Sequence, residues 1–156
     1  MCWSKLWFGK HKGKTLPQVV FIDPDWFFWA MEDGISKGKG KLLYEAQEIY
    51  HKSQSVLIPQ NGSKNLMAEY FIHSPTDKFA YMEIVSASRP DHVGSSITFR
   101  SEVIDLSVPR DISSYDKLGG KLLISNLKSC LFGSSNYRMT KKRCEAFFED
   151  DGNFDL

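Results

Sequence analysis

The chain has 156 residues, a formal net charge of +1 and an apolar fraction of 42%. These values are typical of a globular protein with one domain, or with one small module and one small domain. They argue against a membrane protein, since no apolar run approaches the roughly 20 residues that cross a bilayer. The N-terminus also lacks the apolar core of a secretory signal, so we expect a cytosolic location.

Charge is unevenly distributed along the chain. Residues 1–14 hold four lysines and no acid, whereas residues 145–156 hold five acids and no base. A mildly basic body followed by an acidic tail permits an anionic partner without requiring one.

The N-terminal segment predicts a distinct module over residues 1–53, because all four tryptophans lie in the first 29 residues. It begins with a β-hairpin whose two short strands run from Leu6 to Phe8 and from Lys14 to Leu16. Gly9 and Gly13 bracket the turn, where glycine tolerates a positive φ.

Three helical segments follow the hairpin. Asp23 and Pro24 are a strong start signal, since Asp23 can cap the helix and Pro24 suits its first position. The helix that they begin should end at Asp33 and Gly34, before a loop over residues 36–41. The segments run from Pro17 to Ile22, from Pro24 to Glu32 and from Lys41 to Lys52.

A polar stretch over residues 53–65 is the best linker candidate, and a second domain should occupy residues 66–156. Its strands are expected at 67–73, 78–87 and 95–108, with a turn at 74–77. Helices are expected at 115–131, weakened by Gly119 and Gly120, and from a Thr140 cap to Phe148. The fold class is therefore α+β: a β-hairpin with short helices, then an antiparallel sheet with two C-terminal helices.

The hairpin carries a row of lysines. In an extended arm Lys10, Lys12 and Lys14 would point to one side, roughly 6.6 Å apart. Such a row can follow a polyphosphate backbone, and each neutralised phosphate adds to affinity. His11 would point to the other side, or lie at the turn tip as a donor. The alternative is a solvated hairpin whose lysines only maintain solubility.

The helix PDWFFWAM is unusually rich in aromatic residues. Trp26 and Trp29 are three apart and share a face, whereas we expect Phe27, Phe28 and Met31 in the core. The two indoles either enter the core as well or form an exposed platform on which bases stack.

The stretch F-G-K-H-K-G-K-T-L, followed by D-P-D-W-x-x-W, resembles the small C-terminal module of exodeoxyribonuclease X-like proteins. The matching residues run from Phe8 to Trp29. Together with the helix that follows, to about His51, the resemblance covers about a third of the chain. In that family the module accompanies DNA-processing enzymes and is regarded as an accessory nucleic-acid-binding unit. The resemblance implies that Lys10, Lys12 and Lys14 form the basic hairpin and that Trp26 and Trp29 lie on the neighbouring helix.

The nuclease itself is not recognisable. Related exonuclease domains hold two metal ions with an Asp-x-Glu pair, and this chain has none. The histidines and the three cysteines lack the spacing of metal ligands. We therefore expect the binding module without a catalytic set, a metal ion or a cofactor, and a nuclease with an unfamiliar site is the weakest alternative.

A second basic cluster precedes and begins the last helix: Arg138, Lys141, Lys142 and Arg143. Cations at a helix N-terminus oppose its dipole, which favours a ligand role beside N–H groups that suit a phosphate. The alternative is a solvated helix end. The acidic tail that follows on the same segment could screen the cluster or compete with nucleic acid for it.

Together these features predict a non-catalytic accessory protein in DNA processing that binds nucleic acid, with single-stranded DNA preferred and little sequence specificity. The alternative is a protein-interaction factor, an inhibitor or adaptor acting on a DNA-processing enzyme. The aromatic helix would then be an interface hot spot.

Overall fold

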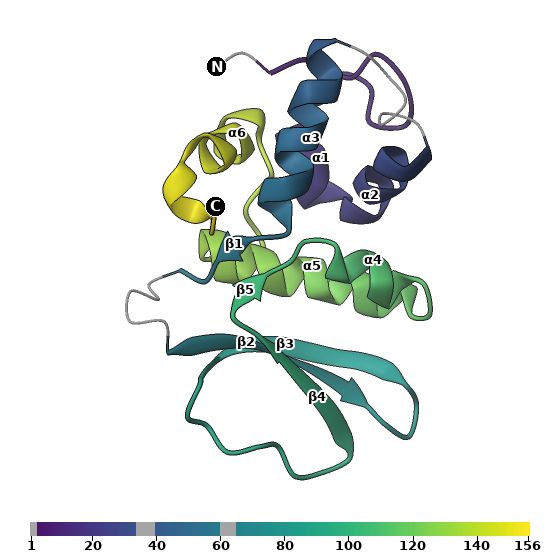
Figure 1. Ribbon diagram of the computed structural model, residues 1–156. Helices are drawn as coiled ribbons and strands as arrows, with labels where there is room; N and C mark the ends of the chain where they lie inside the picture. Colours follow the sequence, from purple (N-terminus) through teal and green to yellow (C-terminus); the bar gives the residue numbers. More distant parts are fainter. Residues whose placement is uncertain (1–2, 34–39, 60–64) are drawn as a thin grey trace. The chain divides into compact units, whose positions relative to one another are not determined.

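Figure 1 shows the computed structural model, which describes residues 3–33, 40–59 and 65–156. The described residues form six α-helices and two small sheets, which confirms the predicted α+β class. The helices are α1 (Leu16–Ile22), α2 (Pro24–Asp33), α3 (Lys41–Ser53), α4 (Val108–Ser113), α5 (Lys117–Phe132), α6 (Lys141–Glu149) and the short 3-10 helix η2 (Asp151–Asn153). The strands are β1 (Val56–Leu57), β2 (Leu66–His73), β3 (Lys78–Ser86), β4 (Ser96–Ser101) and β5 (Val103–Ile104).

The chain divides into two compact units. Unit 1 comprises residues 1–56, 105–107 and 138–156, and unit 2 comprises residues 57–104 and 108–137. This division differs from the expected domains, 1–53 and 66–156, because the C-terminal segment belongs with the N-terminal module. Residues 36–39 of the loop predicted at 36–41 and residues 60–64 of the linker predicted at 53–65 lie outside the described residues.

Aromatic packing explains why the C-terminal segment belongs to unit 1. Phe148 is fully buried and lies 5.4 Å from the ring of Phe21 on α1. Phe154 is also buried and stacks on Phe148. The buried Lys52 ammonium donates to the Phe148 carbonyl at 2.9 Å and to Asp151 at 3.0 Å. The acidic tail is thus packed against unit 1 rather than purely solvated, because its phenylalanines are buried there.

The helices of unit 1 pack around α1, which contacts α2, α3 and α6. Asp23 caps α2 as predicted, since its Oδ1 accepts a hydrogen bond from the Trp26 N–H at 3.2 Å. Phe27, Phe28 and Met31 are buried, as expected. The sequence therefore predicted correctly both where the aromatic helix begins and which of its residues are buried.

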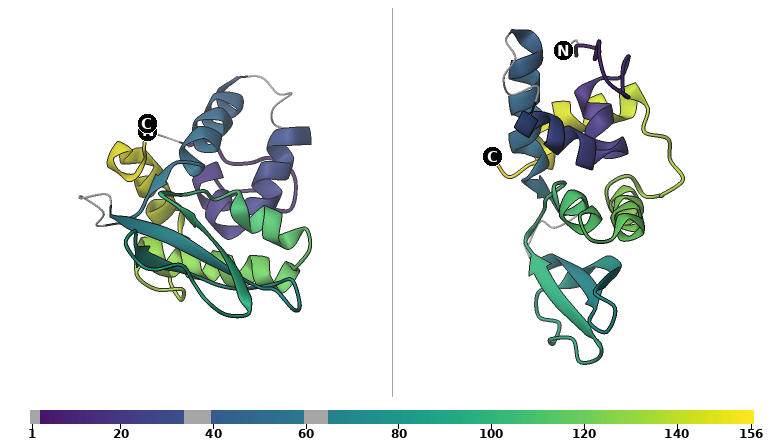
Figure 2. Two further views of the ribbon diagram at one scale, coloured as in Figure 1. Left: turned by 60° about the horizontal axis from the view of Figure 1, so that its bottom comes forward. Right: turned by 90° about the vertical axis from the view of Figure 1, so that its right-hand side faces the viewer.

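Unit 2 is built on an antiparallel sheet with strand order β3-β2-β4. Figures 1 and 2 show α4 and α5 on one face of this sheet. The expected strand at 95–108 is divided into β4, β5 and the start of α4. Asp105 accepts hydrogen bonds from both the N–H and the hydroxyl of Ser107, and Pro109 suits a helix start, so local turn chemistry replaces a continuous strand.

The glycine pair in α5 is buried rather than a point where the helix breaks. A Cβ on Gly119 would lie 2.3 Å from Asp116 Oδ2 and 2.8 Å from Phe79 Cβ. Asp116 caps α5 through the Gly119 N–H and also accepts from the Phe79 N–H at 3.0 Å. Glycine is required here because β3 and the cap approach the helix backbone closely.

Candidate nucleic-acid interface

The two ends of the predicted hairpin pair, since Leu6 N–H donates to the Lys14 carbonyl and Gly13 N–H to the Leu6 carbonyl, both at 2.8 Å, but the segment between them is a compact loop. The only β-bridge described in this segment joins Lys5 and Thr15. Within the loop, Lys12 N–H donates to the Gly9 carbonyl and Lys14 N–H to the His11 carbonyl, so residues 9–14 form consecutive turns. The expectation of an extended arm, with lysines at a period of two, is therefore wrong. Gly9 and Gly13, both at positive φ, allow the chain to coil tightly instead.

One carboxylate ties this loop to the aromatic helix. Asp23 Oδ2 lies 2.8 Å from Lys10 Nζ and 2.9 Å from His11 Nε2. Burial raises the pKa of Asp23, but hydrogen bonds from two side chains and one backbone N–H outweigh it and hold the pKa below the ordinary 3.8. Asp23 is therefore a charged connector as well as a helix cap, a role that its place before Pro24 did not reveal.

His11 is buried, so it does not face solvent at the turn tip, which was one of the two positions expected for it. The residue is 8% exposed, and its ring meets the Trp26 ring edge-on at 5.3 Å. With Nε2 directed to Asp23, the imidazole serves the packing of the loop. The turns bring it inward because an aromatic ring beside Trp26 is better buried than solvated.

Trp26 is the surface against which the loop folds. A Cβ on Gly9 would lie 3.1 Å from its Cζ2 atom, and Phe8 lies 6.3 Å away between ring centroids. Trp26 is half-buried, so it is mainly a support for the loop rather than a free platform. Its neighbour Trp29 lies at 6.3 Å, which confirms that the two indoles share a face.

Two indoles remain open to solvent. Trp7 is 74% exposed and Trp29 is 47% exposed. Trp7 packs edge-on against Phe8 at 4.8 Å, and Phe8 in turn neighbours Trp26, so Trp7 and Trp29 flank one aromatic cluster. Trp7 was not among the predicted site residues, because its position before Phe8 and Gly9 carries no signal of exposure.

The loop lysines differ in their surroundings. Lys10 is paired with Asp23, as described above. Lys12 is exposed and Lys14 is half-buried, and neither forms an ion pair with any residue that the structure describes. The unneutralised charge of the loop therefore resides on Lys12 and Lys14.

The second basic cluster lies at the start of α6, where Thr140 caps the helix as predicted. Its members are Arg138, Lys141 and Lys142, which are exposed, and Arg143, which is half-buried and donates to the Arg138 carbonyl.

Two contacts bring this cluster to the border of the loop. The Thr15 hydroxyl donates to Glu145 at 3.2 Å, and the Gln18 amide donates to the Met139 carbonyl at 3.3 Å. Glu145 is one turn from Lys141 on the same face of α6, and Thr15 directly follows Lys14. The structure thus brings the two basic segments into one unit, although Thr15 and Thr140 are 125 residues apart in the sequence.

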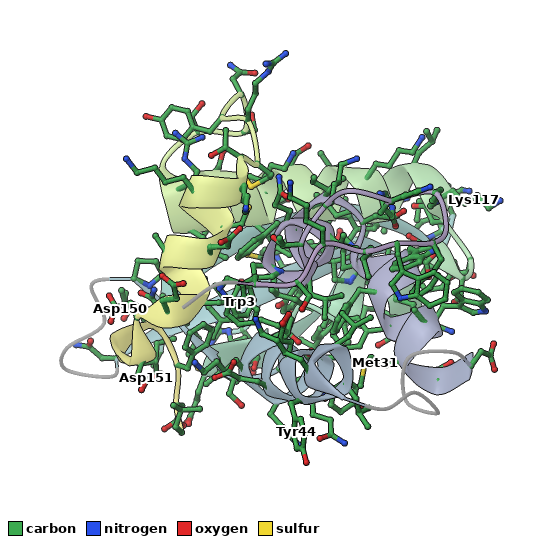
Figure 3. All side chains as sticks on the ribbon, turned by 90° about the horizontal axis from the view of Figure 1, so that it is seen from above. Trp3, Met31, Tyr44, Lys117, Asp150 and Asp151 are labelled. Carbon is green, nitrogen blue, oxygen red and sulfur yellow. The ribbon has the colours of Figure 1, made fainter. Side chains whose placement is uncertain are left out.

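Four of the five tail acids lie at or beyond the other end of α6. Figure 3 shows Asp150 and Asp151 there, with Trp3 beside that end of the helix. Trp3 donates to Glu149 at 3.1 Å, and Asp151 pairs with Lys52. Glu149 and Asp151 thus contribute to the packing of unit 1, whereas Glu145, the fifth tail acid, lies one turn from Lys141 of the basic cluster.

The described residues contain neither a cluster of metal ligands nor a membrane-spanning helix. Across 3–33, 40–59 and 65–156, no group of three or more His, Cys, Asp or Glu residues is arranged to hold a metal ion. None of the helices in these ranges is both long and apolar enough to traverse a bilayer. Comparisons with known proteins find no match for the chain among family models, curated proteins or solved structures.

Proposed function

We propose that unit 1 is a nucleic-acid-binding module that takes single strands without reading a defined sequence, and that the protein is a non-catalytic accessory factor in DNA processing. The observation that carries the proposal is the position of Trp7 and Trp29, two open indoles that flank a cluster packed against a lysine-bearing loop. Stacking on an aromatic ring accepts any base, because every base has a π-face.

The charges of the module favour an anionic strand. Lys12 and Lys14 of the loop and the cations at the start of α6 belong to one unit. Each can neutralise a phosphate and release counterions. Unpaired bases beside these phosphates could reach Trp7 and Trp29, whereas paired bases are already stacked on their neighbours. Single strands are therefore the favoured ligand class.

The resemblance to the exodeoxyribonuclease X-like C-terminal module adds to the proposal. It covers the residues that form the loop, the Asp23 connector and α2. In that family the module accompanies DNA-processing enzymes, so the partner here would be a DNA substrate or the enzyme that processes it. We also expect the protein to act in the cytosol.

The test is a binding titration of a fluorescently labelled single-stranded oligonucleotide with the full chain at several salt concentrations. Replacing Lys12 and Lys14 by Gln should weaken binding and flatten the slope of log K against log[salt] by about 1.4, at about 0.7 per phosphate contact. The matched control replaces Lys117 and Lys121, two exposed lysines of α5 in unit 2, by Gln and should leave the slope unchanged.

A protein partner is the second candidate, because a side chain as open as Trp7 also suits an interface hot spot. The same titration separates the two candidates. Absence of any salt-dependent binding by the wild-type chain overturns the nucleic-acid proposal. Recovery of a DNA-processing enzyme that is lost in the Trp7→Ala variant would then support the second.

A further inference from the structure

The pairing of Asp23 places an anion on Lys10, a lysine of the same loop that the proposed ligand would contact. Lys10 Nζ is 2.8 Å from Asp23 Oδ2, and the Lys10 side chain is 63% exposed against 22% for that of Asp23. The carboxylate is therefore held inside the module, while the ammonium group can leave it and enter solvent.

Asp23 has two further partners that do not depend on Lys10. It accepts from the Trp26 N–H at 3.2 Å and contacts His11 Nε2 at 2.9 Å. The His11 side chain is only 10% exposed, so a bulky phosphodiester cannot reach it as it can reach Lys10. Asp23 would keep its place if Lys10 turned outward.

We propose that Asp23 competes with the phosphate groups of the ligand for Lys10. Its carboxylate neutralises Lys10 in the free protein and thereby limits the affinity of the loop for nucleic acid. This inference rests on the proposed function. Binding exchanges one anion for another at Lys10, so this lysine contributes little net affinity. Lys12 and Lys14 have no such competitor among the described residues and contribute fully.

An exchange of this kind is physically reasonable because exposed ion pairs are weak. A strand that arrives with several phosphates can displace the carboxylate from Lys10 without unfolding the loop. Asp23 thus sets the affinity of the module below what its lysine content alone would provide.

The test compares two variants that change the net charge equally. Asp23→Asn removes the competitor but retains the helix cap, since Asn caps about as well as Asp. Asp25→Asn removes an exposed acid of the same helical turn and is the control for net charge. At 0.1 M salt, Asp23→Asn should bind a single-stranded oligonucleotide about fivefold more tightly than Asp25→Asn, with a salt slope steeper by about 0.7, the value for one phosphate contact.

Lys10→Gln completes a double-mutant cycle. In the wild-type chain, Lys10→Gln should weaken binding less than Lys12→Gln does. In the Asp23→Asn background, both substitutions should weaken binding equally, by about fivefold. Thermal unfolding of each variant verifies the fold. Should Asp23→Asn fail to fold, the comparison of Lys10→Gln with Lys12→Gln in the wild-type chain still decides.

The outcomes separate the inference from the function. Equal affinities of Asp23→Asn and Asp25→Asn, or equal losses from Lys10→Gln and Lys12→Gln in the wild-type chain, overturn the competitor while leaving the nucleic-acid proposal intact. If no form of the protein binds oligonucleotides, the proposed function fails and the inference fails with it.

Discussion

Gly9 lies directly against the indole of Trp26, so that a Cβ at this position would be 3.1 Å from the Trp26 Cζ2 atom. Gly9 also has a φ of +76°, in the left-handed region that favours glycine. The basic loop thus reaches the aromatic helix so closely that even a methyl group at Gly9 would require the Trp26 ring to shift. This contact and the Asp23 pairs together hold the lysine-rich segment against α2.

Replacing Gly9 by Ala should destabilise unit 1 more than the same change at Gly13. Both glycines have positive φ, so both variants bear a backbone cost of about 1–2 kcal/mol. A Cβ on Gly13 meets nothing within 4 Å, whereas one on Gly9 must displace the Trp26 ring. Chemical denaturation followed by tryptophan fluorescence measures both. Equal losses would mean that the Gly9–Trp26 contact contributes no stability.

Truncation of the open indoles should reduce affinity for single strands. Trp7→Ala and Trp29→Ala should each cost roughly 1–3 kcal/mol of binding free energy if each stacks on one base. The matched control is Tyr44→Ala on α3, which removes an aromatic ring that is as exposed as Trp7, at 74%. Figure 3 shows Tyr44 pointing outward from its helix. Equal effects of Trp7→Ala and Tyr44→Ala would argue against specific stacking.

Gly119→Ala should destabilise the protein, although Ala is the better helix former by about 1 kcal/mol. The added methyl group would meet Asp116 Oδ2 at 2.3 Å, and that carboxylate is held by hydrogen bonds from two backbone N–H groups. Overpacking of this kind costs about 1–3 kcal/mol, so we expect a net loss in the free energy of unfolding. An increase in stability would show that the cap and β3 can move aside.

Acid should weaken unit 2 through Asp116. Hydrogen bonds from the Gly119 and Phe79 N–H groups hold the pKa of this carboxyl below its ordinary 3.8. The unfolded chain then binds the proton more readily, so the contribution of Asp116 is complete above pH 3.8 and disappears as pH falls through the lower folded pKa. Unfolding measured from pH 6 to pH 2 should show a steeper loss for the wild type than for Asp116→Asn. Parallel curves would contradict this role.

The local signals in the sequence predicted much of the fold. Asp23 before Pro24 marked the start of α2, Thr140 marked the start of α6, and the turn at 74–77 joined two strands that do pair. Each of these features depends on chemistry between residues a few positions apart, such as a carboxylate or hydroxyl that accepts from a nearby N–H. Such chemistry is visible in a single sequence because both partners lie within one turn of chain.

The candidate site was predicted only in outline. Residue types and order identified a basic segment beside an aromatic helix, but not the exposure of Trp7 or the burial of His11. Exposure depends on which surfaces meet after the chain has folded. The association of residues 138–156 with the N-terminal module likewise follows from phenylalanines that pack across more than a hundred positions.

By itself, the sequence determined where most helices and strands begin, which face of α2 is buried, and that lysines and tryptophans lie close together. Only the tertiary structure decided which of those charges are neutralised and which indoles are open. The reason is physical: capping and periodicity act along the chain, whereas ion pairing and burial act through space, between groups such as Lys10 and Asp23 that the fold alone brings together.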